Sequence, residues 1–71
     1  MKYKGLRVEF VDDVGENKGG YFCEVYRGDE EDRFDDFCIT ASGLVHNPDP
    51  EYWARMYIDG AIMEYRRAGL I

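Results

Sequence analysis

The sequence predicts a small α+β domain in which a three-stranded antiparallel sheet is covered on one face by one C-terminal helix, in the order β-β-β-α. Two observations predict this fold class. Short stretches in which apolar and polar residues alternate occupy the chain as far as Thr40, and one long stretch with helical periodicity follows them. The 71 residues suffice for one small core, so we expect residues 1–71 to form a single domain.

The clearest predicted element is a helix over residues 50–68. Asp49 can accept hydrogen bonds from the first free amides of this helix, and Pro50 lacks only an amide that would be unpaired anyway. Arg66 and Arg67 suit the negative end of the helix dipole, and Gly69 can adopt the left-handed conformation of a cap. One apolar face is expected to lie on the sheet, and it holds Ala54, Tyr57, Ile58, Ala61, Ile62, Tyr65 and Ala68.

A second apolar stripe runs along the same helix, outside the face that covers the sheet. A two-layer domain has no obvious means of burying this stripe, and large exposed apolar patches usually mark contacts. We expect the stripe to be buried by another chain, most simply by a copy of the same protein. The alternative is that a tilted helix places these residues under a loop. The stripe consists of Tyr52, Met56 and Met63, with Trp53 at its border.

Three strands are predicted before the helix, over residues 5–11, 21–27 and 33–40. Each shows a period of two, with one side apolar, as expected for strands that bury one face. The segments between them are rich in glycine and in acidic residues, which favour turns. The expected connections are turns at residues 12–20 and 28–32 and a loop at residues 41–48.

The second and third strands are expected to form a hairpin with apolar residues paired on one face and an opposite-charge pair at its mouth. The pairs in this register are Val25 with Phe37, Cys23 with Ile39 and Arg27 with Asp35. The other face would then show aromatic residues among carboxylates. The residues expected there are Phe22, Glu24, Tyr26, Asp36, Cys38 and Thr40.

Residues for catalysis or metal binding are few. Cys23 is expected to face the core and Cys38 the opposite surface, which disfavours a disulfide between them. Their spacing matches no metal motif, and His46 is the only histidine. We therefore expect no enzyme activity, no metal and no cofactor. An enzyme would need a pocket whose carboxylates have shifted pKa values.

The charge of the chain restricts its partners. Fifteen acidic and nine basic residues give a formal charge of −6, which disfavours direct binding to nucleic acid or to an anionic membrane. No charged leader and no apolar stretch of about 20 residues is present, so we expect a cytoplasmic protein. Residues 9–51 hold 13 acidic and three basic residues, hence a charge of −10, while the helix is neutral.

The acidic residues are densest in the segment GDEEDRFDD. One interpretation is a solvated turn that keeps the protein soluble and protects a sheet edge. The other is a surface that imitates the phosphate charges of a duplex and binds a basic nucleic-acid-binding protein, with aromatic residues as apolar anchors. The residues predicted for this contact are Asp29, Glu30, Glu31, Asp32, Asp35 and Asp36, together with Phe22, Tyr26 and Phe34.

The order of three strands and one helix resembles part of the double-stranded-RNA-binding fold and the small antitoxin modules of the HicB type. With its length, its charge and the segment GDEEDRFDD, the chain is similar in kind to phage-encoded inhibitors of host defence, and closest among these to the anti-CRISPR proteins that act as DNA mimics. This resemblance implies an inhibitor that acts in the cytoplasm of a bacterial host. The alternative function is a dimeric regulatory or antitoxin-like module without catalysis.

Overall fold

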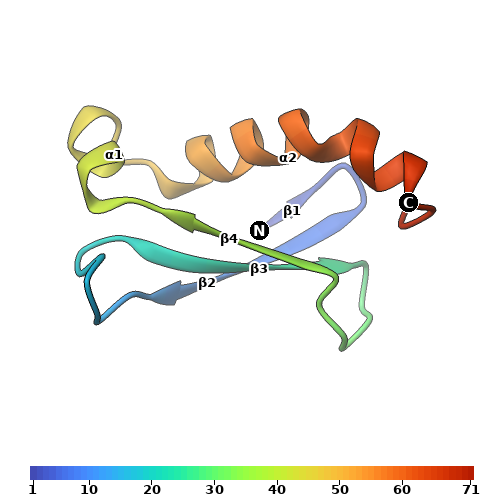
Figure 1. The fold of residues 1–71 in the computed structure, drawn as a ribbon, viewed down its shortest axis with the longest axis horizontal. Helices are drawn as coiled ribbons and strands as arrows, with labels where there is room; N and C mark the ends of the chain where they lie inside the picture. The colour runs from blue at the N-terminus through green and yellow to red at the C-terminus, as the bar shows by residue number, and fades with distance from the viewer.

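The computed structural model describes all residues from Met1 to Ile71. It is a two-layer α+β fold, in which an antiparallel sheet of four strands packs against a C-terminal helix (Figure 1). The strands follow one another in the sheet in their chain order, β1-β2-β3-β4. The elements are β1 (Lys2–Tyr3), β2 (Leu6–Asp12), β3 (Tyr21–Arg27), β4 (Asp35–Ile39), α1 (Ala41–His46) and α2 (Pro50–Arg67).

The sheet has one strand more than the three predicted. β1 pairs with the start of β2, with Tyr3 opposite Leu6. Lys4 and Gly5 form the two-residue turn between them, and both have a positive φ, of 52° and 79°. Two-residue hairpin turns favour this backbone conformation because it matches the twist of the strands. A strand of two residues is too short to show a period of two, so alternation could not predict it.

The segment predicted as a loop at residues 41–48 contains the short helix α1. Thr40 caps this helix, because its hydroxyl oxygen accepts a hydrogen bond from the Gly43 amide at 3.0 Å. The carbonyl of Asn47, just after α1, accepts a hydrogen bond from the Trp53 indole at 2.9 Å. This contact ties α1 to the first turns of α2.

The helix α2 begins and ends close to its predicted limits. Asp49 accepts from the Glu51 amide at 3.0 Å, and Gly69 follows the last turn with a φ of 74°. Ala54, Ile58 and Tyr65 of the predicted apolar face are buried against the sheet and close a single core. Tyr57 and Ala68, predicted for the same face, are exposed, and Ala68 follows the end of α2. The core residues are Leu6, Val8, Cys23, Val25, Phe37, Ile39, Ala54, Ile58 and Tyr65. No helix has both the length and the apolar composition that crossing a membrane requires.

The predicted register between β3 and β4 is wrong by two residues. Phe37 lies opposite Cys23, Ile39 opposite Tyr21, and Asp35 opposite Val25. The apolar pattern does not distinguish these registers, since a shift of two residues keeps every side chain on the same face. The connection is also longer than predicted, because β4 begins at Asp35 and residues 28–34 form the loop.

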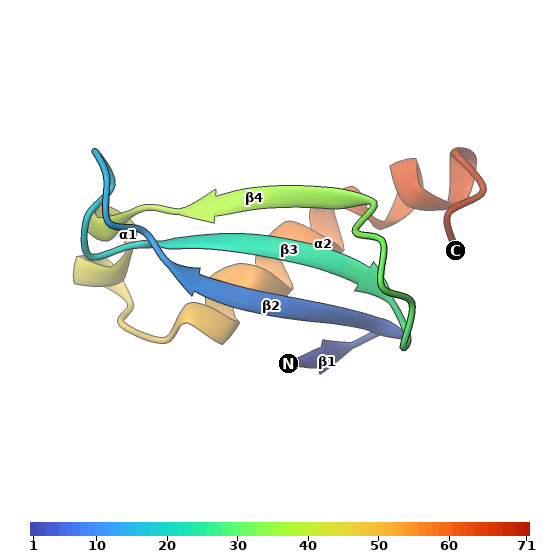
Figure 2. The same ribbon diagram turned by 90° about the horizontal axis from the view of Figure 1, so that it is seen from below.

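The helix α2 crosses the sheet obliquely (Figure 2). Its N-terminal turns lie on the β2 side, and its C-terminal turns lie level with β4 and beyond the start of that strand. The Ile39 end of β4 is therefore not covered by α2. The short helix α1 lies near this end instead (Figure 1).

Candidate functional site

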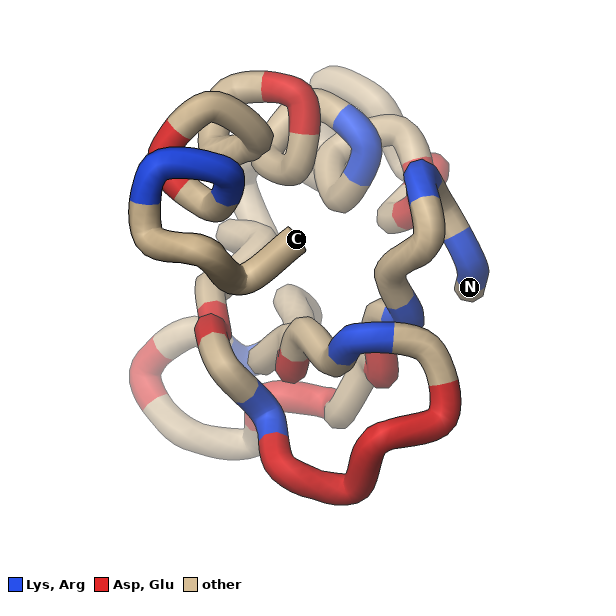
Figure 3. The backbone as a smooth tube through the Cα atoms, turned by 90° about the vertical axis from the view of Figure 1, so that its right-hand side faces the viewer, with Lys and Arg blue, Asp and Glu red and all other residues tan.

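The loop between β3 and β4 presents four consecutive acidic residues, Asp29 to Asp32, and all four are exposed. They form a continuous acidic segment at one end of the molecule (Figure 3). The guanidinium of Arg7 donates hydrogen bonds to the carbonyls of Gly28 and Glu30, the second at 3.1 Å. The Glu30 amide donates to the Arg27 carbonyl at 2.9 Å. The backbone of this acidic hairpin, residues 28–32, is thus held mainly through main-chain carbonyls, not through its carboxylates.

Three of the four carboxylates have no partner within the chain. Asp29, Glu31 and Asp32 take part in no hydrogen bond and no ion pair, whereas Glu30 pairs with the Arg27 Nε at 3.1 Å. An exposed ion pair of this kind contributes about 0–1 kcal/mol to stability. The chain therefore does not need the three free carboxylates for its fold.

Asp35 was predicted to belong to the same acidic surface, and the structure turns it toward α2. Its Oδ2 accepts hydrogen bonds from the hydroxyls of Tyr57, at 2.8 Å, and of Tyr65. Burial and then the hydrogen bond to Asp35 raise the pKa of Tyr57 to about 12. The same two causes raise the pKa of Tyr65. Asp35 thus connects β4 to the covering helix and is half-buried.

The open face of the sheet carries a row of three carboxylates. The register places Glu9 opposite Glu24 and Glu24 opposite Asp36. Arg33 offsets part of this charge, since its Nη1 lies 2.9 Å from Glu24 and its Nη2 lies 4.0 Å from Asp36. The three side chains do not gather as a metal site would require. Sequence reasoning placed Glu24 and Asp36 on this face and missed Glu9, although the alternation in the first strand indicated its side.

The aromatic residues predicted as anchors are divided between two faces. Phe22 and Tyr26 lie on the open face, and each ring is covered by a guanidinium, from Arg33 at 5.4 Å and from Arg7 at 4.4 Å. Phe34 precedes β4, and its ring packs edge-on with the ring of Tyr65, with 5.0 Å between the two ring centroids. Phe34 thus packs against the core and is half-buried, and its role as an anchor for a partner stays a prediction.

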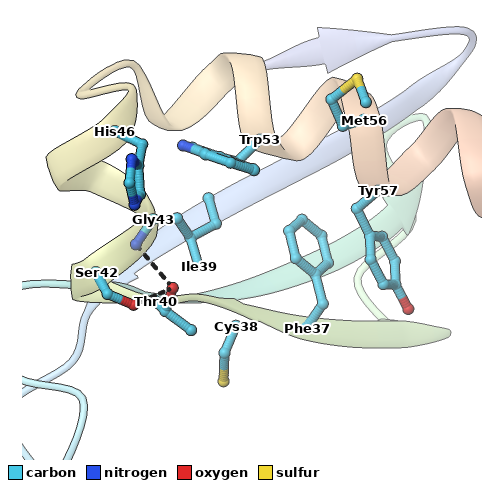
Figure 4. A pocket seen from close by; sticks show the side chains of 10 residues that line it. All are labelled: Phe37, Cys38, Ile39, Thr40, Ser42, Gly43, His46, Trp53, Met56 and Tyr57. Carbon is cyan, nitrogen blue, oxygen red and sulfur yellow. Dashed lines mark hydrogen bonds between the residues drawn. The ribbon is translucent and has the colours of Figure 1, made fainter.

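A groove of about 460 Å³ lies between β4, α1 and the N-terminal half of α2 (Figure 4). Phe37 and Tyr57 stack at one end, with 4.0 Å between their ring centroids. His46 and Trp53 lie at the other end, while the Cys38 sulfur points away from them. The walls of the groove are mainly apolar and include Phe37, Ile39, His46, Trp53, Met56 and Tyr57.

The residues predicted for self-association do not form one patch around this groove. Trp53 and Met56 line the groove, and Tyr52 packs against the Trp53 ring with 5.2 Å between the centroids. Met63 is exposed and does not line the groove. Met56 and Met63 are seven residues apart and so share one face of α2, as predicted from helical periodicity, but only Met56 reaches the groove.

Together these features describe a small acidic α+β protein with an anchored acidic hairpin at one end and an apolar groove beside an edge strand. Comparison of the chain with protein-family models, with curated proteins and with solved structures finds no match. The resemblance in kind to phage-encoded anti-CRISPR inhibitors stays a prediction.

Proposed function

We propose that this protein is an inhibitor that occupies a basic nucleic-acid-binding surface of a target protein or complex, as a DNA mimic of the anti-CRISPR kind. The observation that carries this proposal is the acidic hairpin, with three unpaired carboxylates at Asp29, Glu31 and Asp32 on an anchored backbone. Such a target would be in the cytoplasm of a bacterial host.

The chemistry of the hairpin suits a basic channel. A duplex presents about one negative charge per 1.7 Å of its axis, and proteins bind these charges with lysine and arginine, largely without regard to sequence. Carboxylates on an anchored turn attract the same side chains at long range and do not have to be ordered on binding. Glu24 and Asp36 extend the acidic surface onto the open face of the sheet, where Phe22 and Tyr26 add apolar area.

The test is a charge reversal of the three free carboxylates, Asp29→Lys with Glu31→Lys and Asp32→Lys. These exposed side chains make no hydrogen bond and no ion pair within the chain, so the fold should persist. Proteins captured from a bacterial lysate at low salt would be purified, loaded with a fluorescent DNA duplex and challenged with each variant. We expect wild type to displace the duplex, less so as salt is raised, and the charge-reversed variant to leave the duplex bound.

The matched control carries the same change of charge at the other end of the molecule. Asp12→Lys with Asp13→Lys and Glu16→Lys alters the last residue of β2 and the turn that follows it, at the end opposite the acidic hairpin (Figure 1). This control should displace the duplex nearly as well as wild type. If the hairpin variant displaces the duplex as well as the control does, or if wild type displaces none, the protein is not a mimic of this kind.

A second candidate function is a dimeric regulatory or antitoxin-like module without catalysis. The exposed Met56 beside the groove favours this candidate, because an apolar side chain in that position is suited to burial by another chain. Groove substitutions would then abolish the activity, and the charge reversal in the acidic hairpin would leave it intact.

A further inference from the structure

The two edges of the sheet differ in how well they are protected. β1 is an edge strand of two residues with an exposed lysine, Lys2, and short charged edges resist pairing with other chains. β4 is an edge strand of five residues, and its outer side has no partner strand. The Ile39 carbonyl points inward, because it accepts at 3.0 Å from the side chain of Asn17, in the turn just before β3, and Ile39 lies opposite Tyr21 of β3. Since main-chain groups alternate along a strand, those of Asp36 and Cys38 point outward.

The groove beside this edge is free of charge in an otherwise acidic protein. None of its lining residues is Asp, Glu, Lys or Arg, although the chain carries 15 acidic residues. Met56 and Tyr57 are exposed at its rim. The groove therefore offers no carboxylate that could bind a basic peptide. A second copy of the same acidic chain can approach here without bringing carboxylates against carboxylates.

We propose that two copies of this chain pair through β4, antiparallel, about a two-fold axis at Cys38. The two sheets then form one sheet of eight strands, with both α2 helices on the same face. In this register Phe37 lies opposite Ile39 of the partner subunit, and Asp36 lies opposite Thr40 of the partner subunit, so no carboxylates face each other. The pairing satisfies the free main-chain groups of Cys38 and brings the rims of the two grooves together.

A charge introduced at the rim of the groove tests whether this surface is buried in the dimer. Met56 and Met63 lie on the same helix and are 57% and 61% exposed, but only Met56 lines the groove. Sedimentation equilibrium at high micromolar concentration should give a dimer for wild type and for Met63→Lys, and a monomer for Met56→Lys. A monomeric wild type, or equal loss of the dimer in both variants, overturns the proposal.

A pair of substitutions tests the register. Thr40→Asp keeps a side chain that can cap α1, and it places a carboxylate opposite Asp36 of the partner subunit at two symmetric positions. We expect the dissociation constant of the dimer to rise by about tenfold. Adding Asp36→Lys turns both positions into opposite-charge pairs and should restore the dimer. A dimer that is insensitive to Thr40→Asp, or that the second substitution fails to restore, contradicts this register.

Cross-linking gives an independent readout. Residues directly opposite in an antiparallel pair have Cα atoms about 4.5–5.5 Å apart, within the range that a disulfide spans. An added mild oxidant, which takes up the two thiol hydrogens, should therefore join Cys38 to Cys38 of the partner subunit, while Cys38→Ser should stay uncross-linked. Absence of this cross-link in a dimer places the interface elsewhere.

A monomer that binds a lysine-rich extended peptide at β4 identifies a peptide as the occupant. Either outcome rejects the pairing through β4 but does not contradict the function proposed for the acidic hairpin.

Discussion

Asp35, the first residue of β4, is joined to α2 because its carboxylate accepts hydrogen bonds from the hydroxyls of Tyr57 and Tyr65. Both tyrosines keep their protons above the usual pH range, because burial and the nearby carboxylate disfavour the phenolate. The pKa of Tyr57 is raised from 10.0 to about 12. Folding is thus linked to the neutral form of these side chains.

This linkage predicts a loss of stability at alkaline pH. Between about pH 10 and about pH 12 the unfolded chain releases the Tyr57 proton and the folded chain retains it, so the free energy of unfolding falls as pH rises through this window. Below pH 10 this contribution is fully present. Urea unfolding at a series of alkaline pH values should show the decline, and in the folded protein part of the tyrosinate absorbance should appear only near pH 12.

The substitution Asp35→Asn tests the cause. It removes a charged acceptor and should destabilise the protein by about 1–3 kcal/mol at neutral pH. It should also make the alkaline decline smaller, because the pKa of Tyr57 moves back toward its ordinary value. Asp36→Asn is the matched control, since this exposed neighbour accepts no tyrosine hydroxyl. An equal effect of both substitutions would exclude the tyrosine contacts as the cause.

At the scale of the element, α2 presents alanines at every seventh position on the side that faces the sheet. Ala54 is fully buried, Ala61 is half-buried and Ala68 is exposed. The burial of these alanines falls along the helix because α2 crosses the sheet obliquely and continues beyond it (Figure 2), although Tyr65 near its C-terminal end is still buried. Close packing therefore requires a small side chain most strictly at Ala54, less so at Ala61 and not at Ala68.

Leucine substitutions along this series test the packing. Ala54→Leu inserts a larger side chain into a filled core and should lower the free energy of unfolding by about 1–3 kcal/mol. Ala68→Leu, the same change at an exposed position, should stay within about 0.5 kcal/mol of wild type. Thermal or urea unfolding of both variants gives the comparison. Equal stability of the two variants would show that α2 sits differently on the sheet.

At the scale of the whole molecule, protection from solvent is concentrated in the two central strands. Val8 in β2 and Cys23 and Val25 in β3 have no exposed surface, whereas α1 contains no buried residue. Burial also raises the pKa of the Cys23 thiol to about 12. β1 and β4 are edge strands with a neighbouring strand on one side only, and α1 lies outside the core.

Hydrogen exchange should follow this distribution. Amides of β2 and β3, the strands that are paired on both sides, should exchange most slowly, near the rate set by global unfolding, because they open only when the core opens. Amides of α1 and β1 should exchange faster by local opening. The measurement is exchange monitored by NMR or mass spectrometry. Slower exchange in α1 than in β3 would contradict a core centred on the middle strands.

Several features of the fold could be predicted because they depend on neighbours in the chain. The limits of α2 followed from Asp49, Pro50 and Gly69, and the side of each strand followed from its alternation. Cys23 and Cys38 were assigned to opposite faces by the same rule, and the structure confirms this assignment. The acidic hairpin was also visible, since four consecutive carboxylates at Asp29–Asp32 need no tertiary contact to remain exposed.

The sequence alone therefore determined the order of the main elements, their buried sides and the place of the negative charge. The tertiary structure decided the register of β4, the edge-on contact of Phe34 with Tyr65 and the formation of a groove that Met56 lines and Met63 does not. It also turned Asp35 away from its acidic neighbours and toward two tyrosines. The physical reason is range: caps and alternation act within a few residues, whereas a register, a tyrosine contact and a groove depend on segments that meet only when α2 is packed on the sheet.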